Sequence, residues 1–235
     1  MTTVLLLRHG RTSTNAGGIL AGHQPVELDE TGQAQAGAVG ARFAAAKLPL
    51  AAVVTSPLVR CRQTVAAALP GAADVAVEDG IVEARYGDWT GQPLKKLAKD
   101  PLWSVVQSHP SAARFPGAEA ESMAEMSARA VAAIRDWDAK LTASHGPDAV
   151  WVACSHGDVI KAIVADALGM HLDLFQRIAV DPASITAIRY TPHRPFLLRL
   201  NDTGGDLAVF TPPKRRRRRR ASSDAPVGGG GGTGP

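Results

Sequence analysis

Two His-Gly pairs in this 235-residue chain each follow directly after an apolar run. The first, in Arg8-His9-Gly10, comes after residues 4–7, and the second, in Cys154-Ser155-His156-Gly157, comes after the run at 149–153. A buried strand that ends in this way places its polar side chains at the carboxyl end of a sheet, where open α/β sheets bind their ligands. Two such pairs in one domain are hard to explain by packing alone. They predict a site in which histidines handle phosphate.

The chemistry of a phosphate monoester indicates which other residue types such a site needs. The transferred phosphoryl group spreads negative charge over three oxygens, so fixed donors and positive charge must surround it. Arg8 and Arg60 are candidates because a planar guanidinium can bind two oxygens at once. Asn15 would add a neutral donor, and the helix expected after His156 would offer the amides of its N-terminus.

Hydrolysis also needs a nucleophile and an acid. Neutral imidazole can attack phosphorus near neutral pH and divides the reaction into two easier steps, which favours His9. The leaving oxygen needs a proton, which a carboxylic acid can donate and later recover from water. Glu83 is the best candidate by its sequence context. A solvated glutamate beside Arg85 is the alternative interpretation of that residue.

Four sequence elements, in this order, resemble the motifs of the histidine phosphatase superfamily, which has the phosphoglycerate-mutase-like fold. The resemblance covers about residues 3–209, nearly the whole part expected to fold. The four elements are Arg8-His9-Gly10 with Thr12 and Asn15, the segment 55–64 with Arg60, the segment 83–91 that begins with Glu83, and Ser155-His156-Gly157.

This resemblance implies a role for each matching residue. His9 would be the phosphorylated nucleophile, and Glu83 would be the acid and base. The phosphoryl oxygens would be bound by Arg8, Arg60 and His156, with help from Asn15. The resemblance implies no metal and no other cofactor, and the substrate would be a small phosphorylated metabolite.

Departures from the family pattern favour hydrolysis over mutase activity. Mutases of the family carry an arginine after the acid/base glutamate, where this chain has Ala84. Their longer basic insertion is only partly matched by Lys95, Lys96 and Lys99. The cap has residues 116–122 where the family usually has Pro-Gly-Gly-Glu-Ser, and Arg129 aligns best if Glu121-Ser122 is the matching pair and two residues are inserted. The sequence therefore predicts a phosphatase of small phosphate monoesters that acts through a phosphohistidine.

Two other functions stay open. One is a cofactor-dependent phosphoglycerate mutase, and the other is a non-catalytic phosphate-binding member of the fold. A nucleotide-binding enzyme of the Rossmann type is disfavoured because no Gly-x-Gly-x-x-Gly follows the first strand.

Strand-like and helical patterns alternate along the chain, which is typical of an α/β protein with parallel pairing. We therefore expect a three-layer α/β/α sandwich with a mostly parallel sheet, and a small cap of short helices and loops at about 91–122. The expected strands are 4–8, 50–55, 75–77, 149–154, 184–190 and 196–200. The expected helices are 32–47, capped by Thr31, then 57–69, 121–141 and 158–168. We expect one catalytic domain at 1–211.

The remaining sequence, 212–235, predicts a disordered Arg-rich and Gly-rich tail. Lys214 and the arginines at 215–220 carry seven positive charges, and removing these from the net charge of +4 leaves −3 for the rest. Nucleic acid is therefore not an expected partner of the folded domain, although the tail could contact polyanions in a salt-dependent way. Whether the protein forms a homodimer stays open.

The sequence also indicates the cellular compartment of the protein. Uncharged apolar runs are far shorter than the ~20 residues that a membrane span needs, and no secretory signal is recognised at the start. Cys61 and Cys154 are interpreted as small core residues rather than a disulfide, so we expect a cytoplasmic protein. Five histidines are expected to lie at the surface: His23, His109, His145, His171 and His193.

Overall fold

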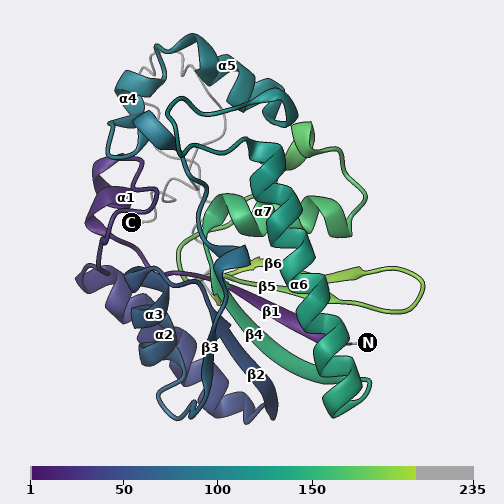
Figure 1. The fold of residues 1–235 in the computed structure, drawn as a ribbon. Helices are drawn as coiled ribbons and strands as arrows, with labels where there is room; N and C mark the ends of the chain where they lie inside the picture. The colour runs from purple at the N-terminus through teal and green to yellow at the C-terminus, as the bar shows by residue number, and fades with distance from the viewer. Residues whose placement is uncertain (1, 205–235) are drawn as a thin grey trace, which may run out of the picture.

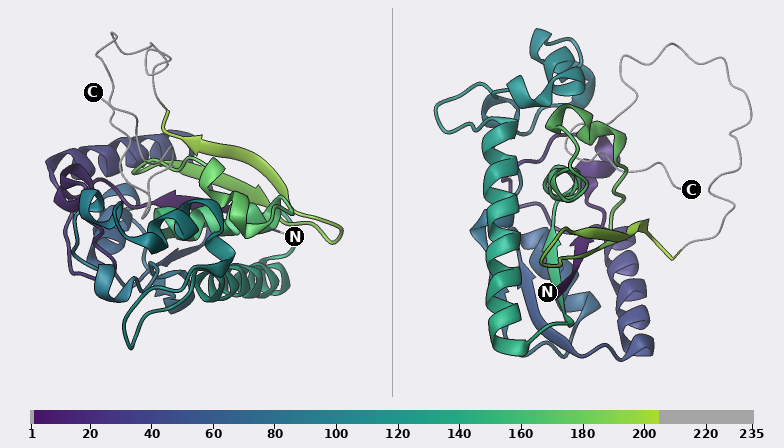
Figure 2. Two further views of the ribbon diagram at one scale, coloured as in Figure 1. Left: turned by 90° about the horizontal axis from the view of Figure 1, so that it is seen from above. Right: turned by 90° about the vertical axis from the view of Figure 1, so that its right-hand side faces the viewer.

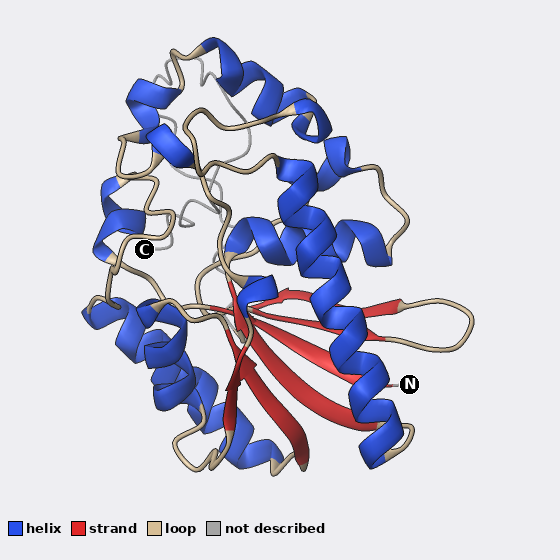
Figure 3. Cartoon of the chain, in the orientation of Figure 1, coloured by secondary structure: helices blue, strands red, loops and turns tan. Residues whose placement is uncertain are grey.

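A six-stranded sheet forms the centre of the computed structural model, which describes residues 2–204 (Figures 1 and 3). The strands are β1 (Thr2–Arg8), β2 (Leu50–Thr55), β3 (Val75–Val77), β4 (Ala149–Ser155), β5 (Ile185–Arg189) and β6 (Phe196–Asp202). Their order in the sheet is β3-β2-β4-β1-β5-β6. The first four of these run parallel, whereas β5 is antiparallel to β1 and β6 is antiparallel to β5. The expectation of a mostly parallel sheet is confirmed.

Helices cover both faces of this sheet, as Figure 2 shows. The four long ones are α2 (Glu30–Ala46), α3 (Val59–Ala68), α6 (Met123–His145) and α7 (Gly157–Ala167). Successive side chains of a strand point to opposite faces. Leu7 and Val53 accordingly pack in one apolar cluster with residues of α2 and α3. Leu6 and Val54 pack in the other with residues of α6 and α7. The three-layer α/β/α sandwich is therefore confirmed.

The starts of the long helices follow their caps rather than the apolar pattern. Helix α2 begins at Glu30, because the side chain of Asp29 accepts a hydrogen bond from the amide of Gly32. Thr31, the expected cap, lies inside the helix, and its hydroxyl accepts instead from Arg11. Helix α6 begins after Ser122, which forms a capping box with Glu125, and it continues four residues beyond the expected end at 141.

Short helices form the cap above the carboxyl ends of the parallel strands (Figure 1). They include α4 (Leu94–Leu97), α5 (Pro101–Ser108) and a 3-10 turn at Pro110–Ala112. Their core is aromatic: Trp89 lies 6.2 Å from Trp103 and 5.5 Å from Phe115 between ring centroids. The cap therefore has short helices and loops where the sequence predicted them. A further short helix, α1 (Ser13–Gly17), was not expected, and Thr12 caps it.

Three sequence expectations concern other parts of the chain. The tail at 212–235 lies outside the described residues, so its disorder and the domain boundary at 211 stay predictions. None of the helices between residues 2 and 204 has the length and apolar composition that crossing a bilayer requires. Cys61 and Cys154 are both buried and unbridged, as expected of core residues.

Candidate active site

The register of β1 and β4 brings the two His-Gly pairs together. Arg8 and Ser155 are the last partners of this parallel pair, so the residues that follow them leave the sheet side by side. The amide of His9 donates to the carbonyl of Ser155 at 3.0 Å. The rings of His9 and His156 then lie 5.3 Å apart between centroids, with an interplanar angle of 59°. Two residues distant in sequence thus share one site.

One hydrogen bond determines which nitrogen of His9 can react. Nδ1 lies 2.7 Å from the carbonyl oxygen of Gly10, and since a carbonyl only accepts, Nδ1 must carry the proton. Nε2 therefore keeps its lone pair. Burial, and next the charges of Arg60 and Arg8, hold the pKa of His9 well below 6.5, so the ring is neutral at neutral pH. A neutral imidazole with a free Nε2 is a competent nucleophile.

Gly10 is glycine for a steric reason. A Cβ built there would lie 2.5 Å from the carbonyl oxygen of Gly32, at the start of α2. The amide of Gly10 also donates to the hydroxyl of Thr64 on α3. This close approach of backbone to backbone fixes the loop that carries His9.

Both arginines are buried and neither side chain points into solvent. Arg8 is fully buried, and its Nη1 donates to the carbonyl of Val180 at 2.6 Å. Its Nε and Nη2 have no hydrogen-bond partner among residues 2–204. Buried guanidinium donors without a partner are costly, so this arrangement fits a site that is completed by an anion. Burial also lowers the pKa of Arg8.

Arg60 fixes the protonation of His156. Its Nη2 lies 2.8 Å from the carbonyl of Gly22 and 3.1 Å from Nδ1 of His156. A guanidinium only donates, so Nδ1 of His156 accepts and the proton of the ring is on Nε2, 2.8 Å from the hydroxyl of Ser56. Burial, and next the charge of Arg60, hold the pKa of His156 well below 6.5.

Glu83 is buried beside these groups, so the alternative of a solvated glutamate is wrong. Its Oε1 accepts from the amide of Ala84 at 3.0 Å, and its Oε2 lies 3.9 Å from Nδ1 of His156. Burial, followed by the charge of Asp158, raises the pKa of Glu83 to about 7, against the lowering effect of Arg60. A carboxyl group with this pKa can both donate and accept a proton near neutral pH.

Asn15 is held at the edge of the same site. Its Oδ1 accepts from the amide of Thr12 at 3.1 Å, and the hydroxyl of Thr12 in turn accepts from the amide of Asn15. A small cavity of about 20 Å³ is lined by His9, Asn15, Arg60, Glu83 and other residues. All six residues predicted for the site therefore lie in or directly around one buried region.

Similarity to known proteins agrees with this geometry. The pattern of the histidine phosphatase superfamily (branch 1) matches residues 4–203. The chain belongs to this superfamily. Residues that bind a phosphoryl group in such a protein are expected at the carboxyl ends of the central strands, which is where the two histidines lie.

The relatives include proteins described as phosphatases and as mutases. The chain is 32% identical to a bifunctional protein of Mycobacterium tuberculosis over 86% of this chain and 54% of that one. It thus spans about half the length of that relative. It is 29% identical to a probable phosphatase of Schizosaccharomyces pombe, over 81% and 88% of the two chains. It is also 29% identical to a probable phosphoglycerate mutase of Klebsiella pneumoniae, over 91% and 97%.

A solved structure shares the fold. The phosphoserine phosphatase of Entamoeba histolytica superimposes with a TM-score of 0.74 at 24% identity, over 86% of this chain and 98% of that one. At this level of identity the likeness concerns the fold. It supports the arrangement of sheet, helices and cap described above.

His23 was expected at the surface, and this was wrong. It is half-buried, and its Nε2 lies 2.6 Å from the carbonyl oxygen of Glu83. Because that oxygen only accepts, Nε2 carries the proton. His23 thus holds the backbone of Glu83 in this member of the superfamily. No strand or helix pattern precedes it in the sequence, so only the fold reveals this contact.

Arg129, like His23, holds the backbone of Glu83 by hydrogen bonding. Its Nε and Nη2 donate to the two carboxylate oxygens of Glu121, at 3.0 and 2.6 Å. The same guanidinium donates to the carbonyls of Val82 and Glu83 at 2.8 and 3.1 Å, and to that of Gly80. The pairing of Glu121 with Arg129 agrees with the alignment favoured from the sequence. It links α6 to the segment that carries the candidate acid.

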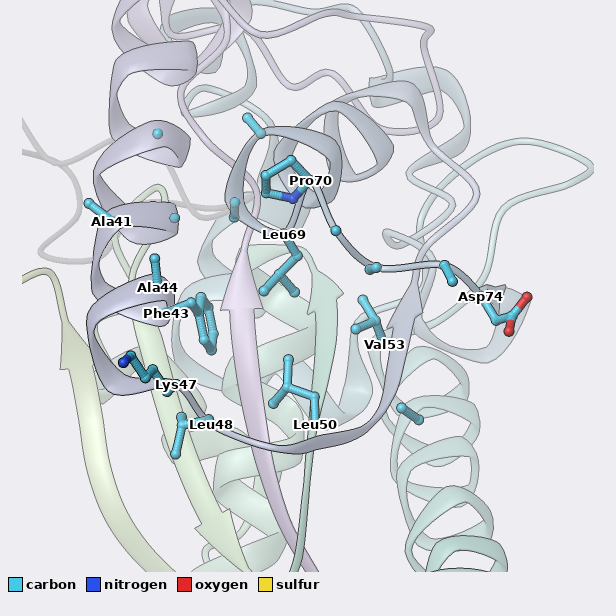
Figure 4. Close-up of a pocket in the computed structure, with 18 of the residues that line it drawn as sticks. Ala41, Phe43, Ala44, Lys47, Leu48, Leu50, Val53, Leu69, Pro70 and Asp74 are labelled. Atoms are coloured by element: carbon cyan, nitrogen blue, oxygen red, sulfur yellow. The ribbon is translucent and has the colours of Figure 1, made fainter.

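A much larger cavity, of about 780 Å³, lies elsewhere between α2, α3 and β2 (Figure 4). Its lining is mostly alanine, glycine and aliphatic side chains, with Phe43 and Pro70 among them and Lys47 and Asp74 as its ionisable groups. Because it includes Leu50, at the start of β2, it is remote from the strand ends that carry the histidines. None of the six residues predicted for the site is among those that line this cavity.

Proposed function

We propose that the protein is a phosphatase that hydrolyses small phosphate monoesters through a phosphohistidine on His9. The observation that carries this proposal is the hydrogen bond of His9: Nδ1 donates to the carbonyl of Gly10, which leaves Nε2 as a nucleophile on a ring that feels the charges of two buried guanidinium groups. Arg8 and Arg60 supply the positive charge that the phosphoryl oxygens need. Positively charged side chains of this kind can bind the phosphate without a metal.

The first half of the reaction transfers the phosphoryl group to the enzyme. Nε2 of His9 attacks phosphorus, and the bond from phosphorus to the ester oxygen breaks. The leaving oxygen takes a proton from the carboxyl group of Glu83, whose pKa of about 7 keeps a large protonated fraction at neutral pH. The products are an alcohol, the phosphohistidine and the carboxylate of Glu83.

The second half returns the enzyme to its starting state. The carboxylate of Glu83 takes a proton from water, whose oxygen attacks phosphorus, and the P–N bond to His9 breaks. Inorganic phosphate leaves, and Glu83 is protonated again. His156 is held within 3.1 Å of Arg60 and 3.9 Å of Glu83, so it can contact the same phosphoryl group during both halves.

The phosphohistidine is tested by trapping. With a ³²P-labelled monoester and an alkaline, denaturing quench, the wild-type protein is expected to carry label that is stable to base and labile to acid. The His9→Ala variant is expected to carry none and to lose hydrolysis. His145→Ala is the matched control, because His145 is exposed at the end of α6. Ordinary hydrolysis of an aryl phosphate by His9→Ala would end the proposal.

A mutase is the second candidate, because a relative is described as one. The residue after Glu83 argues against it: Ala84 is fully buried in the apolar core, so this position supplies no positive charge for a bisphosphate. A coupled assay for interconversion of 2- and 3-phosphoglycerate, primed with the bisphosphate, decides between the two. A non-catalytic binding protein would form no phosphoenzyme in the trapping experiment.

The buried thiols of Cys61 and Cys154 support, as a proposal, a reducing compartment such as the cytoplasm. Homodimer formation stays a prediction that a measurement of mass in solution would test. Contact of the tail with polyanions concerns residues outside those described.

A further inference from the structure

Two buried acid groups lie next to Glu83 without a part in the proposed reaction. Tyr86 and Asp158 are both fully buried, and the phenol hydroxyl donates to Oδ2 of Asp158 at 2.8 Å. Tyr86 follows Glu83 by three residues on the same segment. Asp158 is in the first turn of α7, two residues after His156. The pair thus joins the two segments that carry the acid and the second histidine.

The phenol of Tyr86 donates its one proton to Asp158, and Tyr86 lines the same small cavity as Glu83. Its pKa is raised well above 10 by burial first, then by the charges of Asp158 and Glu83 and by hydrogen bonding to both. A hydroxyl that donates to Asp158 can still accept a hydrogen bond on its oxygen. Glu83 satisfies that acceptor only when Glu83 itself carries a proton. Two ionised carboxylates could not both be satisfied by this single phenol.

The surrounding charges decide which carboxyl group takes the proton. Nζ of Lys161 lies 3.8 Å from Oδ1 of Asp158, so its positive charge stabilises negative charge on that side. Lys161 also contacts Gln176 and the ring of Phe175, which holds it in place. Other charged or titratable groups also face Glu83. Those near its carboxyl group are Arg8 of β1, His9, Arg60 of α3, Tyr86, and His156, Asp158 and Lys161 at or next to α7. His23 and Arg129 contact its backbone carbonyl.

We propose that Tyr86 and Asp158 are positioning residues that keep the proton on Glu83 before each turnover. Asp158 accepts from the phenol, and the phenol oxygen accepts from the carboxyl O–H of Glu83. This inference rests on the proposed function, since it supplies the acid of the first step. When Glu83 has given its proton to the leaving oxygen, its carboxylate lies beside the like charge of Asp158. Repulsion then favours recovery of a proton from water in the second step.

The test compares two substrates across pH. Glycerol 2-phosphate has an alkoxide leaving group that needs a proton, whereas p-nitrophenyl phosphate releases a stable phenolate that does not. The quantity measured is the pH at which kcat/KM falls on the basic side of its profile (the basic limb), because this fall reports the loss of the protonated acid in the free enzyme. The variants are Asp158→Asn, Tyr86→Phe, the double variant, and Asp166→Asn. Asp166 is the matched control because it lies on the same helix but pairs with Arg135 away from the site.

For Asp158→Asn we expect the basic limb with glycerol 2-phosphate to move to lower pH by about one unit, because a neighbouring like charge is removed. Above the limb, this lowers kcat/KM about tenfold, while the value for p-nitrophenyl phosphate changes much less. Tyr86→Phe keeps the ring that packs against Phe115 at 4.9 Å and is expected to shift the limb in the same direction. The double variant is expected to shift it no further than the larger single effect, because the two residues act as one unit.

Other outcomes separate this inference from the proposed function. If the wild type hydrolyses both substrates and the limb stays in place in Asp158→Asn and Tyr86→Phe, the inference is wrong and the phosphatase stands. Equal losses with both substrates and an unmoved limb would show a purely structural role, which also overturns it. If Asp158→Asn does not fold, Tyr86→Phe alone decides. If the wild type forms no phosphoenzyme and hydrolyses neither ester, the proposed function and this inference both fail.

Discussion

Replacing Glu83 with glutamine is expected to remove a pH-dependent loss of stability. Burial, followed by the charge of Asp158, raises the pKa of Glu83 from 4.5 to about 7. An acid whose pKa is higher in the folded protein contributes stability that is fully present below the unfolded pKa and is lost as pH rises through the folded value. A shift of about 2.5 units corresponds to about 3 to 4 kcal/mol, at about 1.4 kcal/mol per unit. The side chain is only 4% exposed, so solvent screens little of this.

The assay is urea unfolding of wild type and Glu83→Gln at pH 5 and pH 8. We expect the free energy of unfolding of the wild type to fall between these pH values by about 2 to 3 kcal/mol more than that of the variant. Other groups, including His9 and His156, titrate in both proteins, so their effects cancel in the difference. Glu119→Gln, at an exposed position of the cap, is the control and is expected to follow the wild type. Parallel pH dependences for wild type and Glu83→Gln would refute the reasoning.

Three further predictions follow from the contacts around the site. Arg129→Met leaves the largely buried carboxylate of Glu121 without its bidentate partner. The free energy of unfolding is therefore expected to fall by about 2 kcal/mol, and kcat is expected to fall with it. Unchanged urea unfolding and unchanged steady-state rates would contradict this. Ser122→Ala removes the cap of α6 and is expected to cost about 1 kcal/mol in the same unfolding assay while kcat/KM stays within about twofold. Burial, and next the charge of Arg60, hold the pKa of His9 well below 6.5. The rate of phosphoenzyme formation is therefore expected to fall only below pH 6.5, where protonation removes the attacking lone pair. A fall in this rate at or above pH 6.5 would argue against His9 as the nucleophile.

The three layers and the mostly parallel pairing of the strands were predictable because they depend on local sequence pattern. Apolar runs of strand length that alternate with helical periods favour a covered parallel sheet whatever the distant residues are. The antiparallel addition of β5 and β6 was not predicted, since the direction of an edge strand depends on the path of its connection. The start of α2 was missed by two residues, because Asp29 caps the helix and Thr31 lies inside it.

The sequence by itself determined that His9 and His156 each follow a buried strand, and that Arg8, Arg60 and Glu83 lie in motifs of one superfamily. Such information is carried by neighbouring residues, so it can be recognised without the fold. Only the tertiary structure decided which nitrogen of each histidine holds a proton.

The tertiary structure also decided what surrounds Glu83. Tyr86 and Asp158 are 72 residues apart in the chain, and His23 is 60 residues from Glu83. A buried polar group needs a hydrogen-bond partner, and packing between distant elements determines which group that partner is. The local sequence therefore does not predict the pairing. The sequence therefore determined which chemical groups the site contains, and the fold determined where their protons lie.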